Sequence, residues 1–190
     1  MSTWFLALPL EALQGLALPS PPPGLHLLDP ADLHVTLSFL GAVGEERARV
    51  AAEVFARELR SRPRCALEVS FERVLPLGPP ARFSVLAATL GEGRDECAAW
   101  LEELRDAPCD ALGIPRDLRP PLPHVTLARV DRHARPRERE RALEWAAGLD
   151  LSRARARITV AALFTRAPLA ADPRSSGGQR YARVLEWNLR

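Results

Sequence analysis

The sequence predicts an α+β fold of two similar lobes, related by a pseudo-twofold axis, each with a short antiparallel sheet and outer helices. Hydrophobic residues make up 47% of the 190 residues and charged residues 26%, the balance of a globular protein with a buried core. Strand-like and helical patterns alternate along the whole chain. The tetrapeptide His-Val-Thr-Leu occurs at residues 34–37 and again at 124–127, which indicates an internal duplication.

The first elements are two strands, a short helix and a loop. The apolar run at residues 3–8 predicts a buried strand, and residues 11–16 predict a short helix. Successive prolines at residues 19–24 fit neither a helix nor a sheet, so they predict a loop. The β-rich run at residues 33–40, which ends before Gly41, predicts the second strand.

The next segment begins with the clearest helix, predicted over residues 45–62. The residues that fall on its apolar face at helical spacing are Ala48, Ala51, Phe55 and Leu59. Alternating apolar residues predict a strand at 65–74. Prolines and glycine predict a loop at 75–81, and a further strand follows at 82–90.

The middle of the chain predicts a long helix over residues 94–112, broken at Pro108 because proline cannot donate the helical hydrogen bond. A proline-rich connection spans residues 114–123. The second His-Val-Thr-Leu copy lies in a strand predicted over 124–130, and a helix follows at 135–147.

The last segment predicts a strand over residues 153–165, a flexible glycine- and serine-containing loop at 172–179, and a closing strand at 181–189. The duplicated units cover about 34–90 and 124–190, with the loop as an insertion in the second unit. We therefore expect residues 1–190 to form a single domain of two intertwined lobes.

Each copy of the repeat contains a His-x-Thr motif. Residues two apart in a strand point to the same face, so His34 shares a face with Thr36, and His124 with Thr126. A pseudo-twofold axis would bring both pairs to one cleft. One neutral and one protonated imidazole suit in-line displacement at phosphorus, because histidine has both forms near neutral pH. The threonine hydroxyls could donate hydrogen bonds to phosphate oxygens, and no metal is required.

Longer signatures around the two motifs resemble those of the two-histidine (2H) phosphoesterase superfamily. Residues 34–41 read His-Val-Thr-Leu-Ser-Phe-Leu-Gly, and residues 123–129 read Pro-His-Val-Thr-Leu-Ala-Arg. Within that superfamily they are most similar to the bacterial and archaeal RNA 2′,3′-cyclic phosphodiesterases, also called 2′-5′ RNA ligases. The opening Phe5-Leu-Ala-Leu-Pro9 and the tail from Gly178 to Leu189 extend the resemblance to nearly the whole chain. The resemblance implies a bilobal fold with the active cleft between the lobes.

The resemblance also implies an activity and roles for residues. The reaction would be hydrolysis of an RNA 2′,3′-cyclic phosphate to a 2′-phosphomonoester, with reversible, ATP-independent 2′-5′ RNA ligation as a second reaction. His34 would be the proton donor and His124 the proton acceptor, although the near-symmetric repeat alone does not assign these roles. Arg129 would contact phosphate, which requires a twist or bulge, because strict alternation places it opposite His124.

Two aromatic residues near these motifs have open or structural interpretations. Tyr181, the only tyrosine, could stack on a base or belong to the core at a strand end, so it is a second candidate for substrate binding. Phe39 faces away from His34 by strict alternation and is therefore predicted to lie in the core.

The partners we expect are RNA ends that carry a 2′,3′-cyclic phosphate, such as tRNA-like or other fragments, with no cofactor. Three cysteines without a C-x-x-C pair fit a reducing, cytoplasmic compartment. No apolar run reaches the length of a membrane span, so no membrane association is expected, and we expect a monomer. All 26 basic residues are arginine. The arginine-rich stretch 132–141 is either a solvated helix face or an RNA-backbone guide.

Three alternatives stay open. The substrate could be another cyclic or 2′-5′-linked nucleotide. The protein could be a metal hydrolase that uses both histidines with Asp32 or Asp131. It could also be a non-catalytic module that binds RNA ends, in which case histidine variants would lose affinity but the wild type would not turn over substrate.

Overall fold

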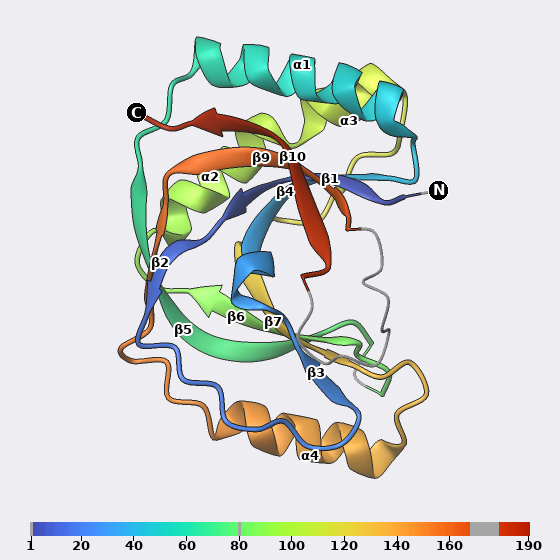
Figure 1. The fold of residues 1–190 in the computed structure, drawn as a ribbon, viewed down its shortest axis with the longest axis vertical. Helices are drawn as coiled ribbons and strands as arrows, with labels where there is room; N and C mark the ends of the chain where they lie inside the picture. Colours follow the sequence, from blue (N-terminus) through green and yellow to red (C-terminus); the bar gives the residue numbers. More distant parts are fainter. Residues whose placement is uncertain (1, 80, 168–178) are drawn as a thin grey trace.

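Antiparallel strands form one curled sheet whose order is β10-β9-β1-β4-β7-β6-β5-β8-β2, with β3 paired to β7 (Figure 1). The computed structural model describes residues 2–79, 81–167 and 179–190. The strands are β1 (Trp4–Pro9), β2 (Glu11–Gln14), β3 (Leu25–Leu27), β4 (His34–Gly41), β5 (Leu67–Leu77), β6 (Val85–Leu90), β7 (His124–Val130), β8 (Arg155–Ile158), β9 (Val160–Arg166) and β10 (Tyr181–Asn188). The helices are α1 (Glu45–Ser61), α2 (Arg94–Leu104), α3 (Asp106–Leu112) and α4 (Pro136–Ala147), and a 3₁₀ turn, η1, covers Pro30–Asp32.

The two strands that begin with histidine, β4 and β7, lie side by side at the centre of the sheet. On the β4 side the next strands are β1, β9 and β10, and on the β7 side they are β6, β5 and β8. After α1 the chain crosses to form β5 and β6 beside β7, and after α4 and β8 it returns to form β9 and β10 beside β1. Each lobe therefore combines strands from distant parts of the sequence.

The helices gather at the two ends of the molecule (Figure 1). The α1, α2 and α3 helices cover the side of β1 and β4, and α4 packs near β5 at the opposite end. The apolar face of α1 is buried, and its Phe55 ring lies 5.2 Å from the ring of Trp187 in β10. The helix ends at Ser61, just before the Arg62–Pro63 step, which disfavours helical backbone.

The apolar run of β1 is buried on both faces, because β1 lies between β4 and β9. Leu6 and Leu8 face the large core under α1, whereas Phe5 and Ala7 join a smaller cluster with Phe164 on the other face. The second face is the one on which the histidine of β4 lies, so this small cluster supports the site described below.

Residues 11–16 do not form the predicted helix. Glu11–Gln14 is the edge strand β2, which pairs with β8 through Glu11↔Arg157 and Gln14↔Arg155. The segment between Pro9 and Gly15 is too short to nucleate a stable helix, whereas strand pairing supplies backbone partners.

The predicted helix over residues 94–112 is divided, but at Arg105 and not at Pro108. The proline ring excludes a helical bond to the carbonyl four residues earlier, at Leu104, which is where α2 ends. Pro108 itself lies in the first turn of α3, where its missing N–H costs nothing. The break therefore precedes the proline by one turn.

The strand predicted over residues 153–165 is two strands, β8 and β9, separated at Thr159. They separate because β8 pairs with β5 and β2 in one lobe, whereas β9 pairs with β1 and β10 in the other. The strand predicted at 65–74 continues to Leu77, so it includes the start of the predicted loop 75–81, and β3 and η1 were not predicted. Most of the loop predicted at 172–179 lies outside the described residues.

Candidate active site

The imidazoles of His34 and His124 are held in the same way. Nδ1 of His34 lies 2.6 Å from the carbonyl oxygen of Asp32, and Nδ1 of His124 lies 2.7 Å from that of Leu122. A carbonyl oxygen accepts hydrogen bonds only, so Nδ1 is the donor in both rings. The carbonyl two residues earlier therefore fixes the tautomer and leaves Nε2 available to exchange a proton with a ligand.

The strand register brings the two His-x-Thr motifs together. β4 and β7 pair antiparallel at Val35↔Val125, and both valines are buried on the core face. Their neighbours point to the opposite face, where the register places His34 beside Thr126 and Thr36 beside His124. The pairing is limited to this one residue pair, so the strands diverge on both sides of it and leave room between the motifs.

A β-bulge in each central strand redirects the residue five positions after the histidine. The register of β4 against β1 shifts between Ser38 and Thr36, and that of β7 against β6 shifts between Ala128 and Thr126. The alternation of buried and less buried residues breaks at the same places, because Leu37-Ser38 and Leu127-Ala128 are consecutive buried residues.

The bulges have two consequences for the predicted residues. Arg129 lies on the same face as His124, as its predicted role as a phosphate contact requires. The prediction that Phe39 lies in the core is wrong, because the bulge turns its side chain to the cleft face, where it is 64% exposed.

Tyr181 links the second motif to an aromatic cluster around His34. Arg129 donates a hydrogen bond from Nη2 to the Tyr181 hydroxyl at 3.0 Å. The His34 ring packs against Phe5 at 4.9 Å and Phe164 at 5.6 Å between centroids, and Tyr181 lies edge-on to His34 at 5.6 Å. Phe5 and Phe164 also stack on each other at 5.2 Å, so the imidazole is one member of a packed aromatic cluster that limits its rotation.

The surroundings of His34 favour its neutral form. Burial lowers the pKa of His34 to about 4, the hydrogen bond to Asp32 opposes this, and electrostatic interactions with Arg129 and His124 lower it further. These surroundings make His34 neutral at pH 7. A bound anion would act in the opposite direction, because a negative charge nearby favours the imidazolium form.

Asp32 ties the end of β10 to the turn that holds His34. Its buried carboxylate accepts hydrogen bonds from the backbone N–H of Arg180 at 2.6 Å and of Tyr181 at 3.1 Å. Burial raises the pKa of this carboxyl, and the two backbone hydrogen bonds oppose the increase. One residue thus supplies the carbonyl for the imidazole of His34 and the carboxylate that places Tyr181.

The motifs line two adjoining cavities. A cavity of about 370 Å³ is lined by His34, Thr126, Arg129 and Tyr181, among others. A larger cavity of about 690 Å³ includes His124 and extends along α3 and the proline-rich connection. Thr36 and Phe39 line both cavities, so the two spaces meet at the central strands. The structure thus brings together the six predicted site residues.

Several residues of the site were not predicted. They are Phe5, Phe164, Arg166, Arg180 and the buried carboxylate of Asp32. Only the repeated spacing carried a usable signal, because Phe39 and Arg129 stand five residues after His34 and His124. Phe5, Phe164 and Arg166 belong to strands far away in the sequence, and Arg180 directly precedes β10, so no local pattern could have identified them. Asp32 lies two residues before His34, but the sequence suggested it only as a possible metal ligand.

The metal-hydrolase alternative finds no support in the arrangement of the acids. The Asp32 carboxylate faces backbone N–H groups, and that of Asp131 accepts a hydrogen bond from the N–H of His133 at 2.9 Å. Among the described residues, no group of three or more His, Cys, Asp and Glu side chains could hold a metal ion. Within the same residues, no helix is long and apolar enough to cross a membrane.

Comparison with solved structures identifies proteins with the same fold. E. coli LigT complexed with 3′-AMP is 17% identical, with a TM-score of 0.65 over 99% of this chain and 98% of that chain. The TT0787 protein of Thermus thermophilus is 21% identical, with a TM-score of 0.60 over 99% and 98% of the two chains. A structure described as a phosphoesterase is 16% identical, with a TM-score of 0.60 over 100% and 99%. No protein-family model and no curated protein matches the sequence. The similarity confirms the predicted α+β, bilobal two-histidine fold.

Proposed function

We propose that this protein, which has the fold of E. coli LigT, is a two-histidine phosphodiesterase that hydrolyses RNA 2′,3′-cyclic phosphate ends to 2′-phosphomonoesters. The observation that carries the proposal is the matched anchoring of His34 and His124, each by the carbonyl two residues earlier, on adjacent strands. Two oriented imidazoles beside two threonines form an acid–base pair around the space that a phosphate would occupy.

The reaction is an in-line displacement at phosphorus. Water attacks phosphorus as one imidazole takes a proton from it at Nε2, and the P–O3′ bond breaks as the other imidazole gives its proton to the departing 3′-oxygen. We assign the donor role to His34 and the acceptor role to His124, following the resemblance in the sequence. Because burial keeps His34 neutral at pH 7, the phosphate anion must raise its pKa for His34 to act as the donor. The ring structure of the substrate keeps the 2′-oxygen attached, so the product is a 2′-phosphomonoester.

The remaining residues have complementary roles. The hydroxyls of Thr36 and Thr126 donate hydrogen bonds to the non-bridging oxygens, where negative charge develops in the transition state. Arg129, oriented by Tyr181, adds a positive charge at the same cavity. E. coli LigT has been solved with 3′-AMP and with phosphate, which supports a nucleotide phosphate as the ligand of this fold. In 2′-5′ ligation without ATP, a 5′-hydroxyl replaces water as the nucleophile, so His124 takes its proton and His34 again gives a proton to the departing 3′-oxygen. The proton-transfer roles are exchanged in the cleavage of the 2′-5′ linkage back to the cyclic phosphate.

An end-product assay tests the proposal. The purified protein is incubated, in EDTA, with a short RNA that ends in a 2′,3′-cyclic phosphate, and the 2′- and 3′-phosphate products are separated. His34→Ala and His124→Ala should each lower kcat by about 10² to 10⁴, the usual contribution of one general acid or base. His26→Ala is the matched control, because His26 lies exposed on β3.

The outcomes separate the alternatives. A 2′-phosphate product that is lost in both variants supports the metal-independent two-histidine mechanism and its regiochemistry. A 3′-phosphate product, or an activity that EDTA removes, contradicts it. If the folded wild type binds the RNA but gives no product, and neither a cyclic nucleotide nor a 2′-5′ dinucleotide is cleaved, the protein is a binding module for RNA ends.

A further inference from the structure

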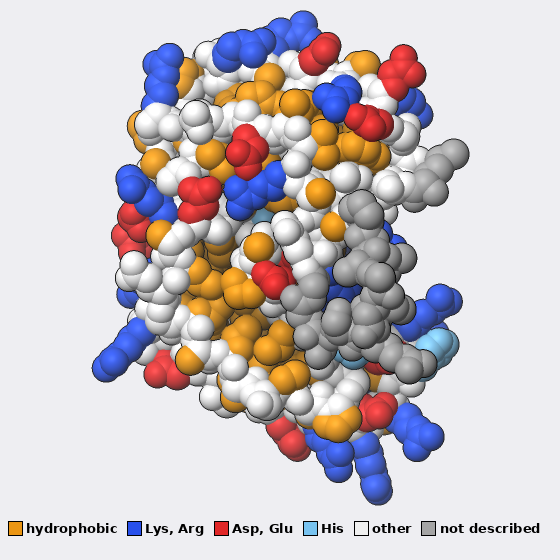
Figure 2. Space-filling view, viewed as in Figure 1, with side chains coloured by type: hydrophobic (Ala, Val, Ile, Leu, Met, Phe, Trp, Pro, Cys, Tyr) orange, Lys and Arg blue, Asp and Glu red, His pale blue; other side chains and the backbone are white. Residues whose placement is uncertain are grey.

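A third cavity, of about 550 Å³, lies where the end of β7, the start of α4 and the segment before β6 meet. Its basic residues are Arg82, Arg129, Arg132, His133 and Arg139, and no carboxylate is among the described residues that line it. We refer to this cavity as the basic pocket. Figure 2 shows arginine side chains gathered at this α4 end of the molecule.

Among the described residues, the arginines of the basic pocket have no acidic partner. Nine other arginines in that part of the chain form ion pairs with acids, as in the pairs Arg49–Glu45, Arg116–Asp110 and Arg119–Asp117. Within the described parts of the chain, the four pocket arginines form no ion pair. The chain has a net charge of only +2, so this gathering of unpaired charge concentrates a positive potential at one place.

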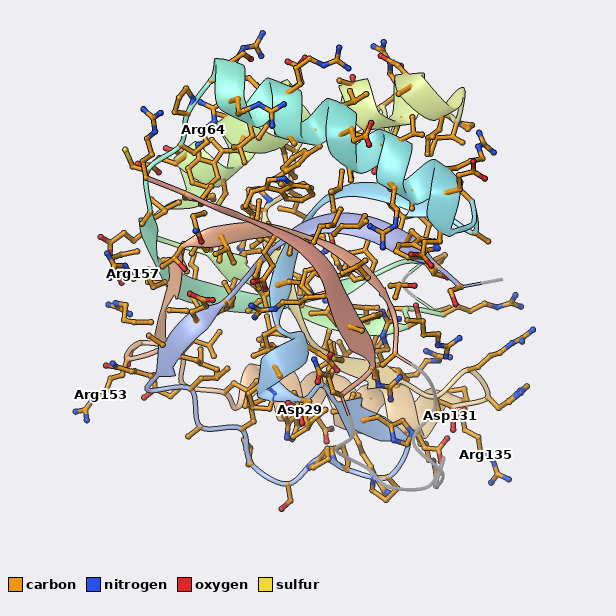
Figure 3. The ribbon with its side chains drawn as sticks, turned by 45° about the horizontal axis from the view of Figure 1, so that its top comes forward. Asp29, Arg64, Asp131, Arg135, Arg153 and Arg157 are labelled. Carbon is orange, nitrogen blue, oxygen red and sulfur yellow. The ribbon has the colours of Figure 1, made fainter. Side chains whose placement is uncertain are left out.

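Two contacts organise the pocket. Arg139 donates a hydrogen bond to the carbonyl oxygen of Phe83, and its guanidinium lies 5.6 Å from the Phe83 ring centroid. Asp131 precedes Arg132 in the sequence and accepts a hydrogen bond from the His133 N–H (Asp131 is labelled in Figure 3). Neither Asp131 nor the glutamates beside Arg139, Glu138 and Glu140, line the pocket. Part of the guanidinium of Arg139 therefore remains available to an anion, and its side chain is already oriented.

Arg129 connects the basic pocket to the active site, because it lines both this pocket and the cavity of His34. A phosphate in the active site and a second phosphate in the basic pocket would therefore both lie beside this side chain. Consecutive phosphates of a single RNA strand have this relation. Clustered guanidinium groups also suit phosphate, because their planar donors match its oxygens.

We infer that the basic pocket binds the phosphodiester group that joins the terminal nucleotide of the RNA to the nucleotide before it. The inference rests on the proposed function and narrows the substrate class to RNA strands of two or more nucleotides. It also assigns a role to the start of the arginine-rich stretch 132–141, whose Arg132 and Arg139 line the pocket.

A substrate-length series tests the inference. The substrates are adenosine 2′,3′-cyclic phosphate, which lacks the second phosphate, and the ApA dinucleotide with a 2′,3′-cyclic end. The wild type should have a kcat/KM at least tenfold higher for the dinucleotide, the gain expected from one charge-assisted contact. Arg132→Gln combined with Arg82→Gln should reduce this ratio toward one. Arg141→Gln is the matched control, because Arg141 is exposed on the same helix and lies outside the pocket.

Each outcome has a defined meaning. If the wild type cleaves both substrates equally well, or if the double variant keeps the full ratio, the phosphate subsite is wrong and the proposed function stands. If the wild type cleaves neither substrate, the proposed function fails, and binding of the 3′-phosphorylated dinucleotide decides the subsite separately. The logarithmic salt dependence of that binding should then be shallower in the double variant by about 0.7 per lost phosphate contact, and an unchanged slope would overturn the subsite.

Discussion

At the scale of single residues, the site depends on what surrounds each histidine. Both imidazoles use the same backbone anchor, but the aromatic cluster of Phe5, Phe164 and Tyr181 surrounds His34. The two rings are therefore not equivalent, although the sequence motifs that contain them are nearly identical. The difference between the two imidazoles comes from neighbours that belong to other strands.

A prediction follows for the titration of His34. Burial, together with electrostatic interactions with Arg129 and His124, lowers its pKa to about 4. Inorganic phosphate should raise this pKa, since an anion favours the charged form. The measurement is an NMR titration of the His34 C2 proton with and without saturating phosphate, assigned with His34→Gln. A midpoint that stays constant or falls would contradict the proposed donor role of His34.

At the scale of elements, the two bulges determine which face of the sheet the side chains after each His-x-Thr motif point to. Strict alternation predicts that Phe39 and Arg129 point away from the histidines, and one extra residue in each strand reverses both side chains. Alternation sufficed to place the two His-x-Thr motifs, which precede the bulges. It failed for the residues after them, because a bulge depends on the pairing of neighbouring strands and not on the strand's own sequence.

Phe39 gives the bulge of β4 a functional test. Its exposed ring lines both active-site cavities, so we expect it to stack on a base of the bound RNA. Phe39→Ala should raise KM by roughly tenfold, the effect of losing one base–aromatic contact, and leave stability nearly unchanged. Phe39→Trp is the matched variant that should retain affinity. Steady-state kinetics with the cyclic dinucleotide, together with a thermal unfolding curve, would check this, and an equal KM for all three proteins would contradict it.

The η1 turn provides a second test at this scale, because Asp32 acts as a positioning residue. Each of its carboxylate oxygens accepts a hydrogen bond from one backbone N–H. In Asp32→Asn an NH₂ group would replace one of these oxygens, so two hydrogen-bond donors would face each other. We expect kcat to fall about tenfold and the NMR signal of His34 to shift, because Tyr181 and the turn would move apart. Asp131→Asn is the control, since its similar bond to a backbone N–H lies outside the cavities. An unshifted His34 signal in Asp32→Asn would contradict this role.

Several element boundaries followed from the sequence, and others did not. The β7 strand and the α1 helix are where their periodicity predicted them, because each has a clear apolar face. The β2 strand and the division of β8 from β9 could not be predicted, since both depend on which strands are available at the sheet edges. Local propensity carries no information about such partners.

At the scale of the whole molecule, the two lobes share their strands. The first unit supplies β4 to one lobe and then β5 and β6 to the other. The second unit supplies β7 to the lobe of β5 and β6, and then β9 and β10 to the lobe of β4. We therefore predict a single cooperative unfolding transition in urea, followed by tryptophan fluorescence and by loss of activity. Phe55→Ala should lower the free energy of unfolding by about 3–5 kcal/mol, because Phe55 is fully buried against Trp187. Two separate transitions would contradict this shared architecture.

The sharing of strands has a consequence for the order of events during synthesis. β1 leaves the ribosome long before its partner β9 and before the Tyr181 that completes the site. A nascent chain that already contains both histidines still lacks the strand that covers β1 and the hydroxyl that orients Arg129. The proposed RNA-cleaving activity should therefore arise only after β10 has emerged.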